Sequence, residues 1–169
     1  MTVWTVLGSG PSMRQELVDY VHGKCQTVAV SDTYRLAPWA DAIVSHDAVW
    51  WDVHTEAWKL AGRKFSGRPH PAVELLPFDV AYLGGINSGL QGMRAAALMG
   101  ASKILLLGFD MHGDHFFGAH PYPLQNTTAD RLAIHIRQFD LWKGCPVTNC
   151  TPGSALKRFP YMALHEALR

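Results

Sequence analysis

Short apolar runs alternate with stretches of helical spacing along most of the 169-residue chain. The first run, residues 3–7, is followed by a glycine-rich turn and then by helical spacing over 13–22. We expect further strands at 27–30, 42–44, 63–66, 104–107 and 146–149. Helices are expected at 48–61, 90–99 and 129–143, with shorter helical pieces at 34–36, 154–159 and 163–168. Proline, glycine and polar residues predict irregular structure over 67–77 and 109–127.

This alternation predicts an α/β fold with an open, mostly parallel, doubly wound sheet in a Rossmann-like three-layer arrangement. The length predicts a single domain, residues 1–169. The continuous apolar run 104–107 is typical of a central parallel strand that is covered on both faces. Ser12 is a candidate N-cap for the first helix.

The turn Gly8-Ser9-Gly10-Pro11-Ser12 lies where α/β proteins often hold phosphate groups, between a first strand and a first helix. Glycines let the backbone approach a ligand closely, and a helix N-terminus offers free N–H groups with a partial positive charge. The turn lacks the third glycine of the dinucleotide fingerprint and the Gly-Lys-Ser/Thr of the P-loop. It therefore predicts a nucleotide or phosphate ligand without naming one.

Polar residues follow five of the expected strands, and ligands of such sheets bind beyond the carboxyl ends of the strands. The five groups are Gly8-Ser9-Gly10, Ser31-Asp32, Ser45-His46-Asp47, Asp110 with its loop, and Asn149 to Ser154. Asn87-Ser88-Gly89 is a second helix start of the kind that binds anions, and ordinary N-capping by Ser88 is compatible with that role. Together these groups predict one crevice for a ligand.

The loop 110–120 contains two aspartates and three histidines, Asp110, His112, Asp114, His115 and His120. Imidazole and carboxylate suit transition metals, but the spacing matches no established zinc motif, and no metal ligand is assigned. Imidazole also titrates near neutral pH, which makes one of these histidines a candidate general acid or base. The third alternative is that they organise the loop by hydrogen bonding.

Composition narrows the classes of partner. Fifteen Lys and Arg against fourteen Asp and Glu give a formal charge of +1, so no overall basic surface favours nucleic acid. We see no apolar run of membrane-spanning length and no signal-peptide pattern, and three cysteines without a Cys-x-x-Cys pair favour reduced thiols. We therefore expect a cytoplasmic protein without a membrane partner. The tryptophans at 39, 50, 51 and 58 favour core packing or contacts in a homo-oligomer over stacking on a base.

Taken in order, these motifs resemble a known group of proteins over nearly the whole chain. The motifs are Gly8 to Ser12, Ser31-Asp32, Ser88-Gly89, Leu107 to Asp110, His115 to His120, and Asn149 to Leu156. The pattern resembles small phage and prophage proteins of no settled function. It is more distantly similar to the bacterial family 42 sialyltransferases and to proteins like archaeal 6-hydroxymethylpterin pyrophosphokinase.

The sialyltransferase resemblance implies a donor site for a cytidine nucleotide. The first turn and the second strand end would hold the nucleotide, and the Ser88-Gly89 helix start and the turn Pro152-Gly153-Ser154 would complete the site. The catalytic base of that family is a histidine after a glycine in the long loop, which implies His120 here, with His115 as second choice. That family has Asn where this chain has Ser9 and where it has Ser31 or Asp32, and a leaving-phosphate tyrosine where it has Gln91.

The pyrophosphokinase resemblance implies ATP and Mg²⁺, with diphosphate transfer to a small alcohol. Asp47 and Asp110 would then hold the metal, and candidates for phosphate-binding cations are Arg35, Arg94 and Lys157. Catalysis of this kind is mostly positioning and charge neutralisation.

Three hypotheses stay open at this point. The first is a transferase for a nucleotide or nucleotide-sugar donor, with a pyrophosphokinase-like enzyme as its alternative. The second is a binding protein of phage type without catalysis, which the residues Ser9 and Gln91 favour. The third is an assembly protein with the tryptophan-rich third as its interface.

Overall fold

Seven parallel strands form one sheet in the computed structural model, which describes residues 1–76 and 86–169. The strands are β1 (Val3–Leu7), β2 (Gln26–Val30), β3 (Ala42–Ser45), β4 (Arg63–Ser66), β5 (Glu74–Leu75), β6 (Lys103–Leu107) and β7 (Val147–Asn149). Their order across the sheet is β5-β4-β3-β2-β1-β6-β7, and all six pairings are parallel. The order reverses between β1 and β6, where β1 pairs in register from Val3–Lys103 to Leu7–Leu107.

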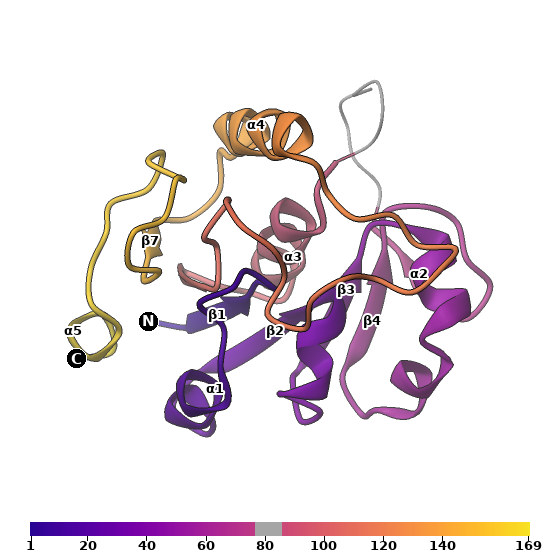
Figure 1. The fold of residues 1–169 in the computed structure, drawn as a ribbon. Helices are drawn as coiled ribbons and strands as arrows, with labels where there is room; N and C mark the ends of the chain where they lie inside the picture. The colour runs from indigo at the N-terminus through magenta and orange to yellow at the C-terminus, as the bar shows by residue number, and fades with distance from the viewer. Residues whose placement is uncertain (77–85) are drawn as a thin grey trace.

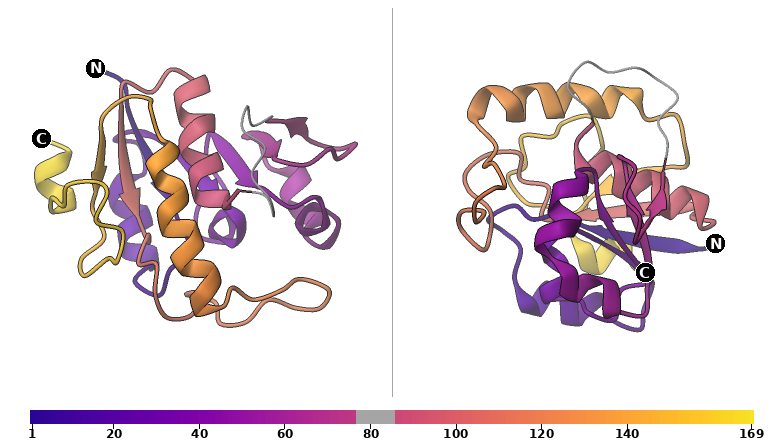
Figure 2. Two further views of the ribbon diagram at one scale, coloured as in Figure 1. Left: turned by 90° about the horizontal axis from the view of Figure 1, so that it is seen from above. Right: turned by 90° about the vertical axis from the view of Figure 1, so that its right-hand side faces the viewer.

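Helices cover both faces of the sheet, which confirms the α/β three-layer arrangement (Figure 1). They are α1 (Gln15–Val21), α2 (Ala48–Val53), α3 (Ser88–Leu98), α4 (Ala129–Gln138) and α5 (Leu164–Ala167). Three 3₁₀ helices add η1 (Ser31–Arg35), η2 (Thr55–Lys59) and η3 (Phe139–Leu141). Figure 2 shows α3 and α4 on the side of the sheet opposite α1.

Alternation along the central strands divides the core into two clusters. Trp4 and Val6 of β1 pack toward α3 and η3, whereas Leu7 packs toward α1, η1 and α2. The four leucine and isoleucine residues 104–107 of β6 divide in the same way and are all fully buried. Burial on both faces explains why this strand is a continuous apolar run.

Several helix boundaries differ from the sequence prediction. Helix α1 begins at Gln15, and its N-cap residue is Arg14 without a side-chain cap; Ser12 does not cap it. The expected helix 48–61 is two pieces, because His54 adopts φ −104° and ψ 56° between α2 and η2. The N-cap of α3 is Asn87, whose side chain accepts the Leu90 amide, so Ser88 is the first helical residue.

Three further segments also differ. Helix α4 ends at Gln138, with η3 beyond it, five residues earlier than the expected helix 129–143. Segment 154–159 is not helical, because the Ala155 amide donates to Asp110 O and the Leu156 carbonyl accepts from Asn149 Nδ2. The stretch 67–77, expected to be irregular, contains the two-residue edge strand β5, and its last residue lies outside the described ones.

Candidate functional site

A cavity of about 850 Å³ lies at the carboxyl ends of the strands. Its walls come from the ends of β1, β2, β3 and β6, the start of α3, the loop after β6 and helix α4. It includes the β1–β6 boundary where the strand order reverses, which is the usual ligand position in open parallel sheets. Its volume is within the roughly 300–1,000 Å³ of small-molecule sites.

Nine of the predicted site residues line this cavity. They are Gly8, Ser9, Gly10, Ser31, Asn87, Ser88, Gly89, His115 and His120. Four of the five polar strand ends therefore converge, as the parallel topology requires. The fifth group, Asn149 to Ser154, does not reach this cavity. Its residues Asn149, Thr151, Gly153 and Ser154 border a separate hollow of about 400 Å³.

The remaining predicted site residues do not line the cavity. They are Pro11, Ser12, Asp32, Asp110, Pro152, Gly153 and Ser154. Asp110 is 3% exposed, and its Oδ2 accepts the Ser12 hydroxyl at 2.8 Å and the Ser12 amide at 3.3 Å. Ser154 donates its hydroxyl to the Phe109 carbonyl. Ser12, Asp110 and Ser154 therefore join the loop after β6 to its neighbours.

The glycine-rich turn packs closely against the turn that follows β6. A Cβ at Gly8 would lie 2.7 Å from the Gly108 carbonyl oxygen, and one at Gly10 would lie 2.6 Å from it. The Gly10 amide donates to that same oxygen at 2.9 Å. Both glycines are thus required by the contact between the two turns at the β1–β6 boundary, in addition to any ligand that they face.

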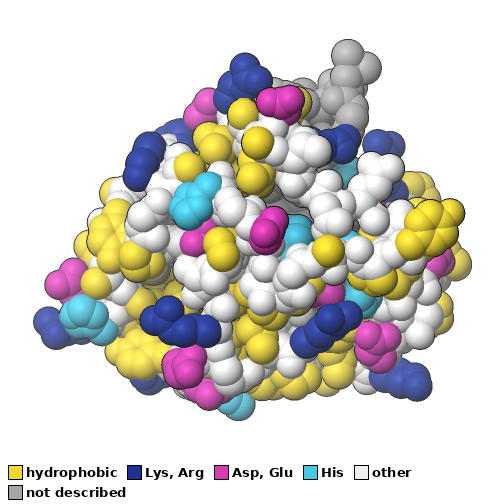
Figure 3. Space-filling view, viewed as in Figure 1, with side chains coloured by type: hydrophobic (Ala, Val, Ile, Leu, Met, Phe, Trp, Pro, Cys, Tyr) yellow, Lys and Arg dark blue, Asp and Glu magenta, His cyan; other side chains and the backbone are white. Residues whose placement is uncertain are grey.

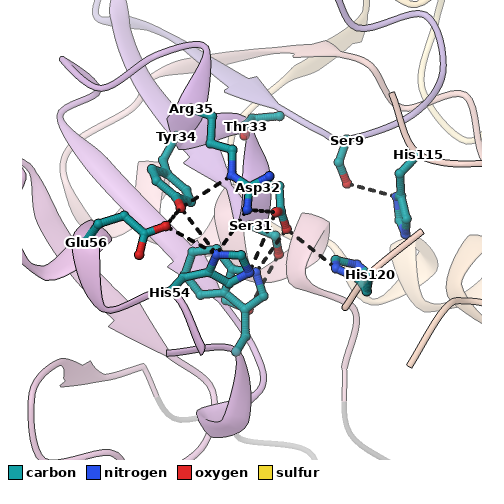
Figure 4. Close-up of polar contacts among 12 residues, drawn as sticks. Ser9, Ser31, Asp32, Thr33, Tyr34, Arg35, His54, Glu56, His115 and His120 are labelled. Carbon is teal, nitrogen blue, oxygen red and sulfur yellow. Dashed lines mark hydrogen bonds and ion pairs between the residues drawn. The ribbon is translucent and has the colours of Figure 1, made fainter. Parts of the chain in front are cut away.

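His115 and His120 lie side by side in the loop after β6. Their ring centroids are 4.8 Å apart, and Ser9 Oγ lies 3.3 Å from His115 Nδ1. His120 Nδ1 lies 3.7 Å from Asp32 Oδ2, across the cavity wall from η1 (Figure 4). Burial lowers the pKa of His120, and the Asp32 carboxylate opposes that effect. His120 therefore has both a cavity position and a carboxylate partner.

Asp32 is the buried centre of a polar cluster behind the cavity. Its carboxylate accepts the Trp50 Nε1–H at 3.1 Å, and Arg35 Nη2 lies 3.3 Å from Oδ1. The Thr33 hydroxyl anchors η1 beneath the sheet by donating to the Leu7 and Val30 carbonyls. Asp32 is fully buried and does not line the cavity, and its carboxylate faces His120.

The cavity wall near the start of α3 contains His46, which the sequence places among the polar strand ends but not among the predicted binding or catalytic residues. His46 is 8% exposed, and its Nδ1 lies 3.4 Å from Nε2 of the fully buried Gln91. The His46 amide donates to Ser88 Oγ at 2.9 Å, which joins the end of β3 to the start of α3. Burial lowers the pKa of His46, and the nearby Arg68 adds to that effect.

Two arginines and another histidine complete this wall. Arg68 follows β4, and Arg131 and His135 lie on α4. Burial, together with Arg131, lowers the pKa of His135. The basic residues expected here, Arg35, Arg94 and Lys157, do not line the cavity. Arg35 instead pairs with Asp32 from behind, and Lys157 borders the smaller hollow. In the sequence, His46 could be predicted only from its place after a strand. No feature of the sequence predicted Arg68 or Arg131 at the site.

The predicted Mg²⁺ ligands do not come together. Asp47 is exposed and lines the cavity, whereas Asp110 is buried against Ser12. Among residues 1–76 and 86–169, no group of three or more His, Cys, Asp or Glu side chains could hold a metal ion. His112 also lines the cavity but makes no ring contact with His115 or His120 in the described part of the chain. The residues present therefore do not fit the metal site of the pyrophosphokinase alternative.

Tryptophan side chains mostly occupy the core, whereas of the cysteines only Cys150 is buried. Trp50 and Trp51 are 2% and 0% exposed, and Trp58 is 40% exposed. All three cysteines are free thiols, and burial raises the pKa of Cys150 to about 11. Figure 3 shows charged side chains of both signs scattered over one face, with histidines between them. In the described part of the chain, no helix is long and apolar enough to cross a membrane.

No protein-family model matches this chain, and no curated protein or solved structure matches it either. The resemblance to sialyltransferases and pyrophosphokinases therefore stays a prediction.

Proposed function

We propose that the protein is a transferase that binds a nucleotide or nucleotide-sugar donor in the cavity and uses His120 as general base. The observation that carries this proposal is an imidazole on the cavity wall, 3.7 Å from a fully buried carboxylate. A carboxylate in that position favours the tautomer with hydrogen on Nδ1, which leaves the Nε2 lone pair to accept a proton. A buried carboxylate orients the histidine of a catalytic triad in the same way.

The donor phosphate fits best at the start of α3. A helix leaves its first N–H groups without partners inside the helix, and Ser88 and Gly89 occupy these positions on the cavity wall. His46, 8% exposed on the same wall, has no hydrogen-bond partner at Nε2 among the described residues, and the Arg68 guanidinium adds positive charge. This combination favours an anionic group in that half of the cavity.

The reaction is then a displacement at the donor. The acceptor hydroxyl gives its proton to His120 Nε2, its oxygen forms the new bond to the donor, and the leaving phosphate takes the electron pair of the broken bond. Asp32 stabilises the imidazolium that forms, because its carboxylate faces Nδ1.

Nucleotide binding is tested first, by thermal shift of the full chain with cytidine, uridine and adenosine mono- and diphosphates, with and without Mg²⁺. A ligand at one hundred times its dissociation constant adds about 2.7 kcal/mol of stability. Absence of any shift across the set would contradict nucleotide binding.

Transfer is tested with nucleotide-sugars and ATP, with products identified by mass spectrometry. His120→Asn should keep the thermal shift and lose turnover, whereas His165→Asn, at an exposed position in α5, should keep both. Turnover by His120→Asn at the wild-type rate would refute the assignment of the base.

A binding protein without catalysis is the second candidate, and one observation favours it. Gln91 stands where the resembled sialyltransferases have a tyrosine that supports the leaving phosphate. In this structure Gln91 is fully buried, contacts His46 and does not line the cavity. A thermal shift without product for any donor would select this candidate.

A further inference from the structure

Two histidines approach the single buried carboxylate of Asp32 from opposite sides. His120 Nδ1 lies 3.7 Å from Oδ2, and His54 Nε2 lies 3.6 Å from Oδ1. The imidazole of His54 is 2% exposed and does not line the cavity. Within the described residues neither His54 Nε2 nor His120 Nδ1 has a hydrogen-bond partner, and the Asp32 carboxylate faces each of them at ion-pair distance.

Further charged and titratable groups surround His54 on its outer side (Figure 4). Its Nδ1 lies 3.2 Å from the Tyr34 hydroxyl, 3.4 Å from Arg35 Nη2 and 3.7 Å from Glu56 Oε1. Tyr34 in turn donates its hydroxyl to Glu56. The His54 ring stacks on Trp50 with a centroid separation of 4.3 Å, which fixes its plane. His54 lies in the break between α2 and η2.

The local charges decide how many protons this cluster can hold. Arg35 already places one positive charge 3.3 Å from Asp32. Protons on both imidazoles would bring three cationic groups against one buried carboxylate, while Glu56 has a side chain 58% exposed and screened by water. Uncompensated charge is costly in a buried site, so protonation of one imidazole disfavours protonation of the other. His115, beside His120 on the cavity side, adds to the same effect when it is charged.

We propose that His54 is a positioning residue that competes with His120 for the charge of Asp32 and so keeps His120 in its unprotonated, base-competent form. This inference rests on the proposed role of His120 as general base. His54 never touches a ligand, because it acts through the carboxylate from the far side of η1. The loop histidine thus depends on a residue 66 positions earlier in the chain, in the break between two helices.

The direct test is an NMR titration of the histidine side chains in the full-length protein, which needs no substrate. His54→Gln removes the competing imidazole and should raise the pKa of His120, because the two groups are coupled through Asp32. Asp32→Asn removes the shared carboxylate and should shift the pKa of His120 in the opposite direction, downward. His165→Gln is the matched control, because its imidazole is exposed and pairs only with Glu166 among the described residues.

Activity gives a second readout if transfer is found. In His54→Gln the acid limb of the kcat/KM profile should move to higher pH, by the same amount as the NMR pKa of His120. A merely structural role would lower the melting temperature and leave the pKa of His120 unchanged, and that result overturns the inference. If Asp32→Asn fails to fold, His54→Gln still decides the question. Coupling without turnover for any donor would refute the proposed transferase and leave the pairing of the two histidines intact.

Discussion

Gly92 lies in the middle of α3, and its small size sets how closely this helix approaches the sheet. A Cβ at this position would lie 2.7 Å from Val30 Cγ2 and 2.9 Å from Val6 Cγ1. Val6 and Val30 are 0% and 4% exposed and belong to strands that are hydrogen-bonded on both sides. Gly92→Ala therefore forces either the helix or the two strands to move, and α3 begins on the cavity wall.

Two opposing energies decide the outcome of Gly92→Ala. Alanine in place of a glycine inside a helix stabilises by about 1 kcal/mol. An extra methyl group in a filled core costs about 1–3 kcal/mol. Both valines are held in place by their neighbours, so we expect the cost of the extra methyl group to exceed the gain in helix stability by about 1 kcal/mol. This difference lowers the melting temperature by about 2–4 °C in a chain of this size.

This loss is measured by urea unfolding that is monitored by tryptophan fluorescence. We expect the m-value to stay unchanged. In a Val30→Ala background one of the two close methyl groups is gone, so the same Gly92→Ala step should be less destabilising by at least about 0.5 kcal/mol. Val147→Ala is the matched control, since this buried valine lies in β7, two strands from β1. A rise in stability of Gly92→Ala, or additive effects with Val30→Ala, would refute the reasoning.

Three further predictions concern individual side chains around the cavity. Ser12→Ala removes the hydroxyl that donates to buried Asp110, and urea unfolding should show a loss of about 1–3 kcal/mol, with no loss contradicting the contact. Asn87→Ala removes the side chain that accepts the Leu90 amide and donates to Gln138 Oε1. It should lower the free energy of unfolding by about 1–2 kcal/mol, which is more than Ser88→Ala should lower it. A larger loss for Ser88→Ala would contradict Asn87 as the cap. Burial raises the pKa of Tyr34 to about 12 from an ordinary value of 10.0, so stability from its protonated hydroxyl is complete below pH 10 and lost as the pH rises toward 12. Melting temperatures over that range should fall less steeply for Tyr34→Phe, and identical slopes would exclude Tyr34 as the cause.

Periodicity in the sequence was sufficient for most of the fold. Buried parallel strands such as 104–107 need continuous apolar residues, and α3 needs small residues against the sheet, so both leave a local signal. The helix break at His54 left no local signal in the sequence. The His54 ring contacts Trp50 and the Asp32 cluster, which are distant from it or irregularly spaced along the chain. The two-residue strand β5 is equally invisible locally, since its existence depends on the neighbouring β4.

The location of the candidate site could be predicted from the sequence, but the role of each residue in it could not. Parallel topology alone brings the ends of β1, β2, β3 and β6 together, which places Ser9 and Ser31 at one cavity, whereas His120 reaches it through the loop after β6. Whether a polar side chain after a strand turns toward that cavity or into the protein depends on the next few backbone angles. Asp32 and Asp110 both turned inward, and each bonds to another part of the chain.

The backbone at the cavity carries the strain that turns these residues. Ser31 and Met111 adopt φ values of 49° and 58°, and they are the only residues other than glycine with positive φ in the described part of the chain. Such a conformation costs roughly 1–3 kcal/mol and persists only where the surrounding structure enforces it. Both residues line the cavity, and both directly adjoin one of the inward-turned carboxylates, Asp32 and Asp110. At Ser31 the left-handed turn begins η1 and directly precedes Asp32, so the strained backbone lies next to the buried carboxylate that is 3.7 Å from the His120 imidazole.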